Sequence, residues 1–236
     1  MDEKNPVAIV TASSRGIGAA TARLLHSRGY RLGLMSNSDA VHSIAKELDA
    51  VSVRGSLTGA KDLEQLVDRT VDRFGRLDAV VINSGNPATG DLFALKDDDW
   101  IDGVELLLLS VIRLTCLVTP ILERGGGGAI IPISAFGAVR PSLDFPISSV
   151  ARSGLSAFIK LFTERYGRTG VRMNAVLPGY VDSYPVDPES IKGIPAGRYA
   201  GVEEIAETVA FLASSDSAYI MGQNILIDGG LVRAIC

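Results

Sequence analysis

A turn of small residues near the N-terminus has the chemistry to hold a phosphate group. The run Thr11-Ala12-Ser13-Ser14-Arg15-Gly16-Ile17-Gly18 directly follows an apolar segment and opens a segment with helical spacing. Glycines at 16 and 18 allow close approach of the backbone to phosphate, and a helix N-terminus attracts its charge. Taken alone, the turn is also compatible with an ordinary strand–helix connection. The expected phosphate contacts are Ala12, Ser14, Arg15, Gly16, Ile17 and Gly18.

Short apolar runs alternate with helical patterns along the chain. Strands are predicted at Val7–Thr11, Leu32–Met35, Val51–Val53, Ala79–Ile82, Ala129–Ile133, Met173–Leu177 and Ile225–Ile227. Helical spacing is clearest at Ala19–Arg28, Leu63–Phe74 and Leu155–Tyr166. This alternation predicts an α/β fold, a Rossmann-type doubly wound parallel sheet of about seven strands with helices on both faces. Such a sheet binds ligands at the carboxyl ends of its strands, where the strand order reverses.

The domain organisation follows from length and from the absence of linkers or repeats. A chain of 236 residues fits one dinucleotide-binding domain covering residues 1–236. The long irregular piece at about residues 180–200 is rich in proline and glycine. Long irregular loops in a compact domain are usually functional. We therefore expect it to be a substrate loop.

Composition narrows the class of partner. A net charge of −4 argues against nucleic acid or an anionic membrane. Two cysteines, Cys116 and Cys236, make neither a disulfide framework nor a zinc spacing, so no metal site is expected. The segment Met1–Pro6 is charged and has no apolar signal region. A cytoplasmic protein is the expectation.

The most apolar stretch of the chain, Val104–Leu122, has the length of a membrane span. It contains Glu105 and Arg113, and charges deep in a span are costly, so a soluble helix is expected. Because nearly every side of this helix is apolar, the sheet is expected to cover one face and another element the opposite face. Together with the apolar helix at 155–166, it predicts a homodimer or homotetramer.

The residues after the second strand bear on the choice of nucleotide. Binding of NAD usually places an acid there for the ribose 2′-hydroxyl. Here the run is Ser36-Asn37-Ser38, with no acid before Asp39. Arg15 offers a planar cation suited to a 2′-phosphate. We therefore expect NADP(H) to be favoured over NAD(H). In the alternative interpretation, Arg15 is solvated and Asp39 caps the next helix.

Three later segments follow predicted strands in the same way. They are Ser56-Leu57-Thr58, Asn83-Ser84-Gly85 and the run from Pro178 to Ser183 (Pro-Gly-Tyr-Val-Asp-Ser). With Asp228-Gly229-Gly230 near the end, the chain resembles the short-chain dehydrogenase/reductase family from about Val7 to Gly230. It departs from that pattern at Ala12, where the family has glycine, and at Ser56, where it has an acid. The resemblance implies further cofactor contacts from Ser56, Leu57, Asn83, Ser84, Gly85, Pro178, Gly179, Val181 and Ser183.

The resemblance also implies a reaction, hydride transfer between a nicotinamide and a carbonyl or alcohol. In the family a tyrosine moves the proton, a lysine holds the ribose, a serine orients the substrate oxygen and an asparagine supports a relay water. Ser134 matches the serine, whereas Leu107 falls where the asparagine belongs, so the relay is expected to be absent. A strand-end serine that bonds local backbone is the other interpretation of Ser134.

The family's Tyr-x-x-x-Lys pair falls in the octet Ser148–Leu155, which contains neither tyrosine nor lysine. Counting from Ser134 aligns the pair with Ile147 and Ala151. Matching Gly154-Leu155 to the family's usual ending aligns it with Ser148 and Arg152. We prefer the second register because it keeps a cation.

This substitution is expected to preserve cofactor binding more than acid catalysis. Arg152 can donate to ribose hydroxyls or to a substrate carboxylate. Ser148 is a far weaker acid than a tyrosine, whose pKa is about 10. Losing a general acid costs roughly 10²–10⁴-fold in rate, about 3–5 kcal/mol. The catalytic candidates are Ser134, Ser148 and Arg152.

Other side chains near the octet have possible supporting roles. Tyr180, Tyr184 and Asp144 are alternative donors, although a structural or specificity role is expected for each. Phe136, Phe145 and Ile147 suggest an apolar pocket wall for a small-molecule substrate that is apolar in part.

Three functions remain open at this point. The preferred one is a divergent NADP(H)-dependent oxidoreductase acting on a carbonyl or alcohol with an altered proton donor. The second is a catalytically silent NADP(H)-binding sensor or partner subunit. The third is a non-redox reaction in the inherited pocket.

Overall fold

The computed structural model describes residues 5–234, so Met1–Lys4 and Cys236, which entered the arguments about targeting and cysteine pairing, lie outside it. The strands are β1 (Val7–Thr11), β2 (Arg31–Ser36), β3 (Val51–Arg54), β4 (Ala79–Ile82), β5 (Gly128–Pro132), β6 (Val171–Met173), β7 (Ala175–Pro178) and β8 (Asn224–Ile227). The helices are α1 (Gly16–Ser27), α2 (Ala40–Glu47), α3 (Ala60–Phe74), α4 (Asp97–Val104), α5 (Ser110–Arg124), α6 (Pro146–Tyr166), α7 (Pro188–Ile191) and α8 (Val202–Ala213). A π-helical turn, Glu105–Leu109, joins α4 to α5.

The sheet is parallel, as expected for strands separated by helical crossovers. Six strands follow the order β3-β2-β1-β4-β5-β6, and the order reverses between β1 and β4. β7 and β8 form a second parallel pair, which an isolated bridge between Ile133 and Val176 connects to the end of β5. The predicted α/β fold with a parallel sheet flanked by helices is confirmed.

One predicted strand is divided in two. The apolar run Met173–Leu177 contributes to both β6 and β7, which Asn174 separates. The Asn174 side chain donates to the Ile220 carbonyl (2.7 Å) and accepts from the Gln223 backbone N–H (2.9 Å). These bonds hold the segment that leads into β8. The seven predicted strands therefore correspond to eight observed strands, because the sixth apolar run is divided between β6 and β7.

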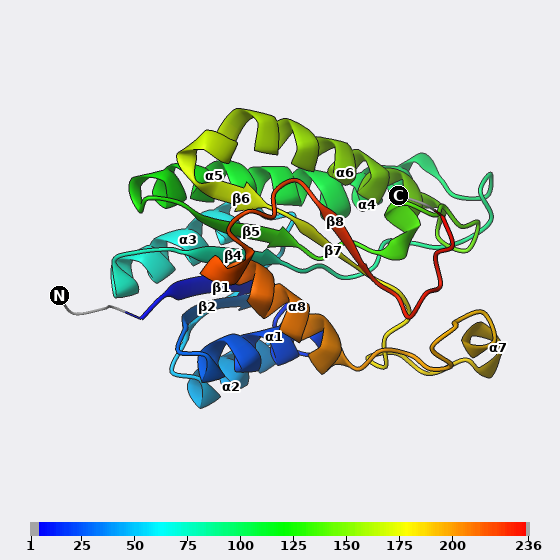
Figure 1. Ribbon diagram of the computed structural model, residues 1–236, viewed down its shortest axis with the longest axis horizontal. Helices are drawn as coiled ribbons and strands as arrows, with labels where there is room; N and C mark the ends of the chain where they lie inside the picture. The colour runs from blue at the N-terminus through cyan, green and yellow to red at the C-terminus, as the bar shows by residue number, and fades with distance from the viewer. Residues whose placement is uncertain (1–4, 235–236) are drawn as a thin grey trace.

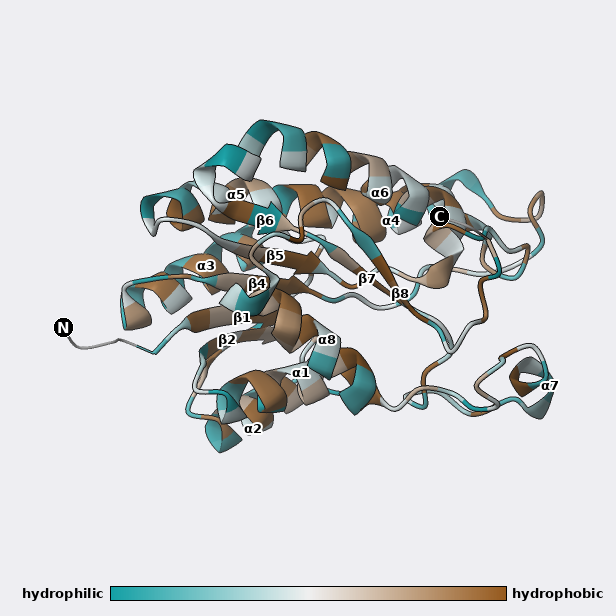
Figure 2. Ribbon diagram, viewed as in Figure 1, coloured by the Kyte–Doolittle hydropathy of each residue, from teal (hydrophilic) through white to brown (hydrophobic). Residues whose placement is uncertain are grey.

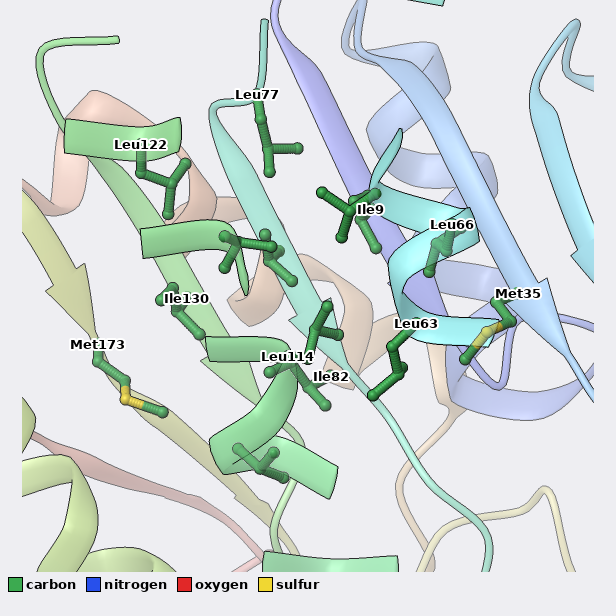
Figure 3. Packing of buried hydrophobic residues seen from close by; sticks show 14 of the residues in the cluster. Ile9, Met35, Leu63, Leu66, Leu77, Ile82, Leu114, Leu122, Ile130 and Met173 are labelled. Atoms are coloured by element: carbon green, nitrogen blue, oxygen red, sulfur yellow. The ribbon is translucent and has the colours of Figure 1, made fainter. Parts of the chain in front are cut away.

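Helices cover both faces of the sheet (Figure 1). α1, α2 and α8 enclose one apolar core with the sheet, and α3, α5 and α6 enclose the other. In the second core, Leu63 of α3 and Leu114 of α5 lie over Ile82 of β4 (Figure 3). The hydropathy colouring shows the same division, with brown strands between helices that are teal on their outer sides (Figure 2). The two cores fix the carboxyl ends of the strands at one edge.

The octet lies in the first turns of α6. Pro146 occupies the start of the helix, where its missing N–H is no loss. Ile147 is fully buried and contacts α4 at Gly103, where an added Cβ would lie 2.1 Å from its Cγ2. The inward direction of Ile147 means that it is a core residue, and the expectation that it forms a pocket wall was wrong.

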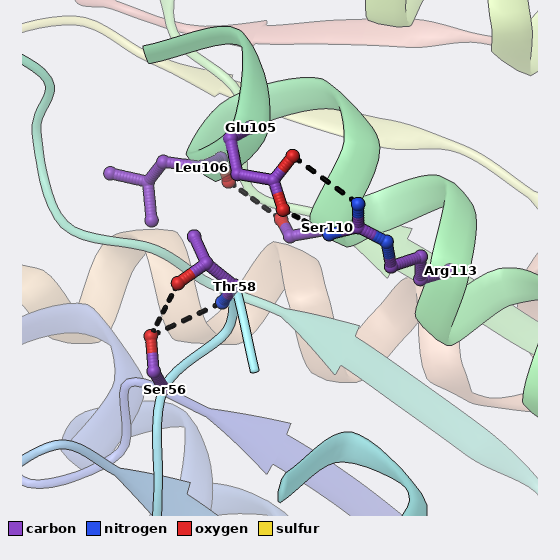
Figure 4. A network of polar contacts seen from close by, with 6 residues as sticks. All are labelled: Ser56, Thr58, Glu105, Leu106, Ser110 and Arg113. Carbon is purple, nitrogen blue, oxygen red and sulfur yellow. Dashed lines mark hydrogen bonds and ion pairs between the residues drawn. The ribbon is translucent and has the colours of Figure 1, made fainter. Parts of the chain in front are cut away.

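The helical run Asp97–Arg124 is long and apolar enough, by length and composition, to span a membrane, a test that core helices of globular domains also pass. About 39% of its most apolar window is buried within the described structure. Leu114, Val118 and Leu122 face the sheet, whereas Ile101 and Leu109 are exposed. Glu105 and Arg113 form an ion pair across the π turn (Figure 4). The sheet therefore covers one side of this run, as expected for a helix of the globular fold.

Candidate active site

The phosphate turn connects β1 to α1 at the strand-order reversal. Gly16 has φ +54°, a left-handed conformation that suits glycine. Gly18 is a position of close approach, because an added Cβ would lie 2.3 Å from the Ala12 carbonyl oxygen. Ile17 packs partly against the core, and Arg15 is exposed just before the helix. The backbone of this turn is thus open to a ligand, and its N–H groups are at the start of α1.

Ala12 carries backbone strain in this turn. Its φ is +46°, in the left-handed region where a Cβ crowds the following carbonyl. Glycine would adopt this conformation without strain, whereas alanine is strained in it. The turn keeps the conformation that glycine would adopt, and the alanine is held there by neighbouring bonds.

Those bonds come from the loop after β4. The Thr11 hydroxyl donates to the Asn83 carbonyl (2.7 Å) and accepts from the Asn83 N–H (2.9 Å). The Asn83 side-chain amide donates to the Ala12 carbonyl at 3.4 Å. Ser84 and Gly85 continue the same loop, and the Ser84 hydroxyl donates to the Gly85 carbonyl. Asn83 therefore fixes the phosphate turn against the neighbouring loop.

The segment after β2 faces the same turn. The hydroxyls of Ser14 and Ser36 lie 2.9 Å apart, and the Ser38 N–H donates to Ser36 Oγ. Asn37 is exposed. The Asp39 carboxylate makes no capping bond and instead pairs with Arg54 at 3.2 Å. The alternative in which Asp39 caps α2 is therefore wrong.

Arg54 is a further candidate for the site that the sequence analysis did not identify. It is the last residue of β3 and lies opposite Ser36 in the parallel register. In the sequence it was visible only as a cation at the end of a predicted strand. The register of β2 and β3 is what places it beside the segment after β2.

The loop after β3 shows a similar rearrangement. Asp62 of α3 accepts from the Ser56 N–H at 2.8 Å, so an acid from the next helix lies beside the position where the family has its own acid. The Ser56 and Thr58 hydroxyls are 2.8 Å apart (Figure 4). The Leu57 side chain is buried in the core, which leaves its backbone as the part able to meet a ligand.

The three catalytic candidates lie together at the end of β5. Arg152 Nε donates to Ser148 Oγ (3.1 Å), and one terminal nitrogen of Arg152 donates to the Ile133 carbonyl (2.8 Å). Ser134 follows Ile133, and its backbone N–H donates to the Val176 carbonyl. The Ser134 hydroxyl is buried and has no hydrogen-bond partner among the described residues. A buried hydroxyl without a partner, one residue after the carbonyl that Arg152 binds, is a candidate partner for a polar ligand atom.

Arg152 is only 6% exposed. Burial lowers the pKa of Arg152 to about 10, and the charge interaction with Tyr184 opposes that shift. The guanidinium therefore stays cationic at neutral pH. In the alternative register, Ile147 and Ala151 are both buried among apolar side chains. Leu107 is also buried, and its side chain offers no hydrogen-bonding atom at the relay position.

The segment after β7 crosses toward the phosphate turn. Pro178 pairs with Ile227 of β8, and the Gly179 N–H donates to the same residue's carbonyl. Val181 forms a bridge with Ala200. Ser183 lies against Gly16, where an added Cβ would be 3.2 Å from that of the serine. The loops after β1 and β7 thus meet at the expected edge.

An aromatic cluster borders this segment. The Tyr180 ring stacks on Tyr199 at 5.2 Å between centroids and lies 5.7 Å from Phe136. Ile194 and Leu231 complete the buried part of the cluster, and Phe145 packs against it. Phe136 and Phe145 therefore belong to one aromatic cluster with Tyr180, and their role as a pocket wall stays a prediction.

A cavity of about 470 Å³ lies elsewhere, lined in part by His26, Tyr30, Arg31 and Phe74. These residues are near the amino ends of the strands, opposite the motif loops. Within residues 5–234, no group of three or more His, Cys, Asp or Glu side chains is arranged to hold a metal.

Comparison with known proteins identifies the family. The family model described as enoyl-(acyl carrier protein) reductase matches residues 11–232. A 3-oxoacyl-[acyl-carrier-protein] reductase of Synechocystis sp. is 32% identical, with 96% of both chains covered. The chain belongs to the short-chain dehydrogenase/reductase family.

Further members of the family differ in substrate. A cis-4-hydroxycyclohexanecarboxylate dehydrogenase of Sinomonas cyclohexanicum is 32% identical, with 95% of both chains covered. A solved 7α-hydroxysteroid dehydrogenase, complexed with NADH and 7-oxo glycochenodeoxycholic acid, superposes with a TM-score of 0.91 over 98% of this chain and 96% of its own at 24% identity. The latter likeness supports the fold alone.

As a short-chain dehydrogenase/reductase, the protein is an oxidoreductase that uses a nicotinamide dinucleotide. The site residues fit that cofactor on two observations. Gly16 and Gly18 allow the tight turn whose N–H groups lie at the start of α1, where a pyrophosphate would bind. The buried Ser134 hydroxyl has no partner in the described structure, and Ser134 follows Ile133, whose carbonyl accepts from Arg152. This short-chain dehydrogenase/reductase thus combines a retained nucleotide turn with an altered reaction centre.

Proposed function

We propose that the protein is an NADP(H)-dependent oxidoreductase that interconverts a carbonyl and an alcohol by hydride transfer, with a proton donor other than the family's tyrosine. The observation that carries the proposal is the buried Arg152 cation, anchored to Ile133 next to the unpartnered Ser134 hydroxyl. Bound NADPH would supply the hydride.

Arg152 is suited to hold the cofactor ribose and a developing negative charge. A guanidinium has five N–H donors. Two of them serve Ser148 and the Ile133 carbonyl, which leaves three for a ligand. The cation in a buried site also stabilises an oxyanion strongly, because the surrounding dielectric is low. Arg152 therefore takes over the electrostatic part of the lysine's role.

Ser134 and Ser148 have different roles in this proposal. The Ser134 hydroxyl donates to the substrate oxygen, which gives its buried O–H a partner. Ser148 Oγ accepts from Arg152 and orients the guanidinium. A serine hydroxyl is too weak an acid to replace tyrosine, so Ser148 acts as a positioning residue in the catalytic group.

Two arginines favour NADP(H) over NAD(H). Arg15 precedes α1, and Arg54 holds the Asp39 carboxylate that follows Ser36. A 2′-phosphate here would gain charge-assisted hydrogen bonds, whereas a ribose 2′-hydroxyl would find no unpaired acid at Asp39. Calorimetric titration tests this preference. We expect NADPH to bind at least about tenfold more tightly than NADH, with most of the difference lost in Arg15→Gln/Arg54→Gln. Tighter binding of NADH would overturn the preference.

The substrate is proposed to be a small molecule that is apolar in part. The aromatic cluster of Phe136, Tyr180 and Tyr199 begins two residues after Ser134, and Tyr180 is its partly exposed member. NADPH oxidation with acetoacetyl-coenzyme A, 4-oxocyclohexanecarboxylate and a 7-oxo bile acid tests the reaction on three carbonyl classes. Turnover of any of them supports the proposal.

A silent NADP(H)-binding sensor or partner subunit is the second candidate. It is favoured by the apolar Leu107 at the relay position and by the loss of the tyrosine. The variant Ser148→Tyr/Arg152→Lys separates the two candidates. If NADPH binds to both proteins and only the variant reduces the carbonyls, the silent role is correct.

The protein is also proposed to be cytoplasmic and to form a homodimer or homotetramer. The outer faces of the apolar helices expose Ile101, Leu109, Val150 and Leu161. Exposed apolar side chains on neighbouring helices are typical of subunit contacts. Sedimentation as a monomer at micromolar concentration would overturn this assembly.

A further inference from the structure

The reaction centre lacks a proton donor within the catalytic group. The Ser148 hydroxyl is bonded to Arg152, and Arg152 remains a cation at neutral pH. The Ser134 hydroxyl is also a very weak acid. Reduction of a carbonyl nevertheless needs a proton for the alkoxide oxygen. The donor must therefore come from another element that reaches the carboxyl ends of β4, β5 and β7.

Two of the three alternative donors are held elsewhere. The Tyr180 ring stacks on Tyr199 and packs at a tilt against Phe136 in the aromatic cluster. The Asp144 carboxylate accepts from the Ser142 hydroxyl within the exposed turn before α6. Both side chains thus serve local packing or local bonding.

Tyr184 is placed differently. It follows Ser183, which lies against the phosphate turn at Gly16. The Tyr184 hydroxyl accepts from the Asn86 side-chain amide at 3.2 Å, although the two residues are 98 positions apart. Tyr184 therefore reaches from the loop after β7 to the loop after β4, across the edge where the sheet binds its ligand.

Tyr184 is also electrostatically coupled to the reaction centre. Burial lowers the pKa of Arg152, and the charge interaction with Tyr184 raises it. The Tyr184 side chain is about half exposed, so solvent can return the proton afterwards.

On the basis of the proposed function, we propose that Tyr184 is the proton donor of this enzyme and that Asn86 positions its hydroxyl. Bound NADPH would supply a hydride, whose electron pair would form the new C–H bond at the carbonyl carbon. The C=O π pair becomes the oxygen lone pair that takes the Tyr184 proton. The products would be NADP⁺, the alcohol and the Tyr184 phenolate. Water would then return a proton to the phenolate oxygen. The donor has thus moved from α6 to the loop after β7.

The first test does not depend on turnover. Tetranitromethane nitrates accessible tyrosines, and peptide mass spectrometry reports the extent at each one. We expect saturating NADP⁺ to protect Tyr184 and to leave the fully exposed Tyr219 unchanged as an internal control. Equal nitration of Tyr184 with and without bound NADP⁺ would overturn the proposal. Absence of NADP⁺ binding by calorimetry would instead overturn the proposed function.

The second test measures the rate with a carbonyl that the wild type reduces. Tyr184→Phe should lose roughly 10²–10⁴-fold in kcat, as expected when a general acid is removed, with an unchanged Kd for NADPH. Tyr219→Phe is the matched control, because Tyr219 is fully exposed and lies outside the proposed site, and it should keep its rate within about threefold. In the Ser148→Tyr/Arg152→Lys background, adding Tyr184→Phe should have little effect, because a second donor is present. A Tyr184→Phe variant that retains the wild-type rate would overturn the role of Tyr184 and leave the proposed function standing.

Discussion

The strain at Ala12 gives a stability prediction of unusual sign, because replacing a residue by glycine should stabilise this protein. Ala12 has φ +46°, and a left-handed conformation costs an L-residue roughly 1–2 kcal/mol. Ala12→Gly removes that cost. It also raises the conformational entropy of the unfolded chain, which opposes the gain by about 0.4–1 kcal/mol. The net expectation is a rise of about 0.8 kcal/mol in the free energy of unfolding, or about 2–3 °C in Tm for a domain of this size.

Urea denaturation and thermal melting measure this change, and Ala157→Gly provides the matched control. Ala157 is an exposed residue within α6. Glycine in a helix interior costs about 1 kcal/mol, so this variant should be less stable than the wild type. The two alanine-to-glycine changes should therefore have opposite signs. Equal destabilisation by both would refute the assignment of strain to the phosphate turn.

Three further predictions concern other parts of the molecule. Gly18→Ala places a methyl group against the Ala12 carbonyl and should weaken NADPH binding at least about tenfold by calorimetry, whereas an unchanged Kd would mean that the turn does not approach the nucleotide. The Arg198 side chain and the Gly201 N–H lower the pKa of Glu204 to about 2 from an ordinary value of 4.5. The stabilisation of the start of α8 should then be present above pH 4.5 and lost as pH falls through 2, so the Tm difference between wild type and Glu204→Gln should shrink between pH 6 and pH 2. A difference independent of pH would contradict this pairing. Leu161→Asp places a charge on the exposed apolar face of α6 and should shift the sedimentation coefficient to that of a monomer, whereas Lys160→Asp on the same helix should sediment as the wild type does.

The fold was predictable because its signals are local. Apolar runs of three to six residues mark the strands, and the turns at Gly16–Gly18 and Asn83–Gly85 mark the carboxyl ends of two of them. The interruption at Asn174 was not predictable, since it depends on bonds to Ile220 and Gln223, some fifty residues away.

The candidate site was predictable in part for the same reason. Ser134, Ser148 and Arg152 could be named from their motifs, whereas the bond from Arg152 to the Ile133 carbonyl required the packing of α6 on β5. The pairing of Arg54 with Asp39 depends on the register of β2 and β3, and the contact of Tyr184 with Asn86 joins two irregular loops. No periodic pattern reports such contacts. Sequence reasoning therefore found the residues at strand ends and missed those that loops bring together.

The central claim is that hydride transfer persists in a site without the family's tyrosine. Single-turnover reaction of stoichiometric protein with NADPH deuterated at the transferring C4 position tests it most directly, with 4-oxocyclohexanecarboxylate and acetoacetyl-coenzyme A as the carbonyl probes and mass spectrometry of the products. We predict an alcohol that carries one deuterium on its carbinol carbon. Tight NADPH binding, with no deuterated alcohol from either probe in the wild type and deuterated alcohol in Ser148→Tyr/Arg152→Lys, would contradict the claim.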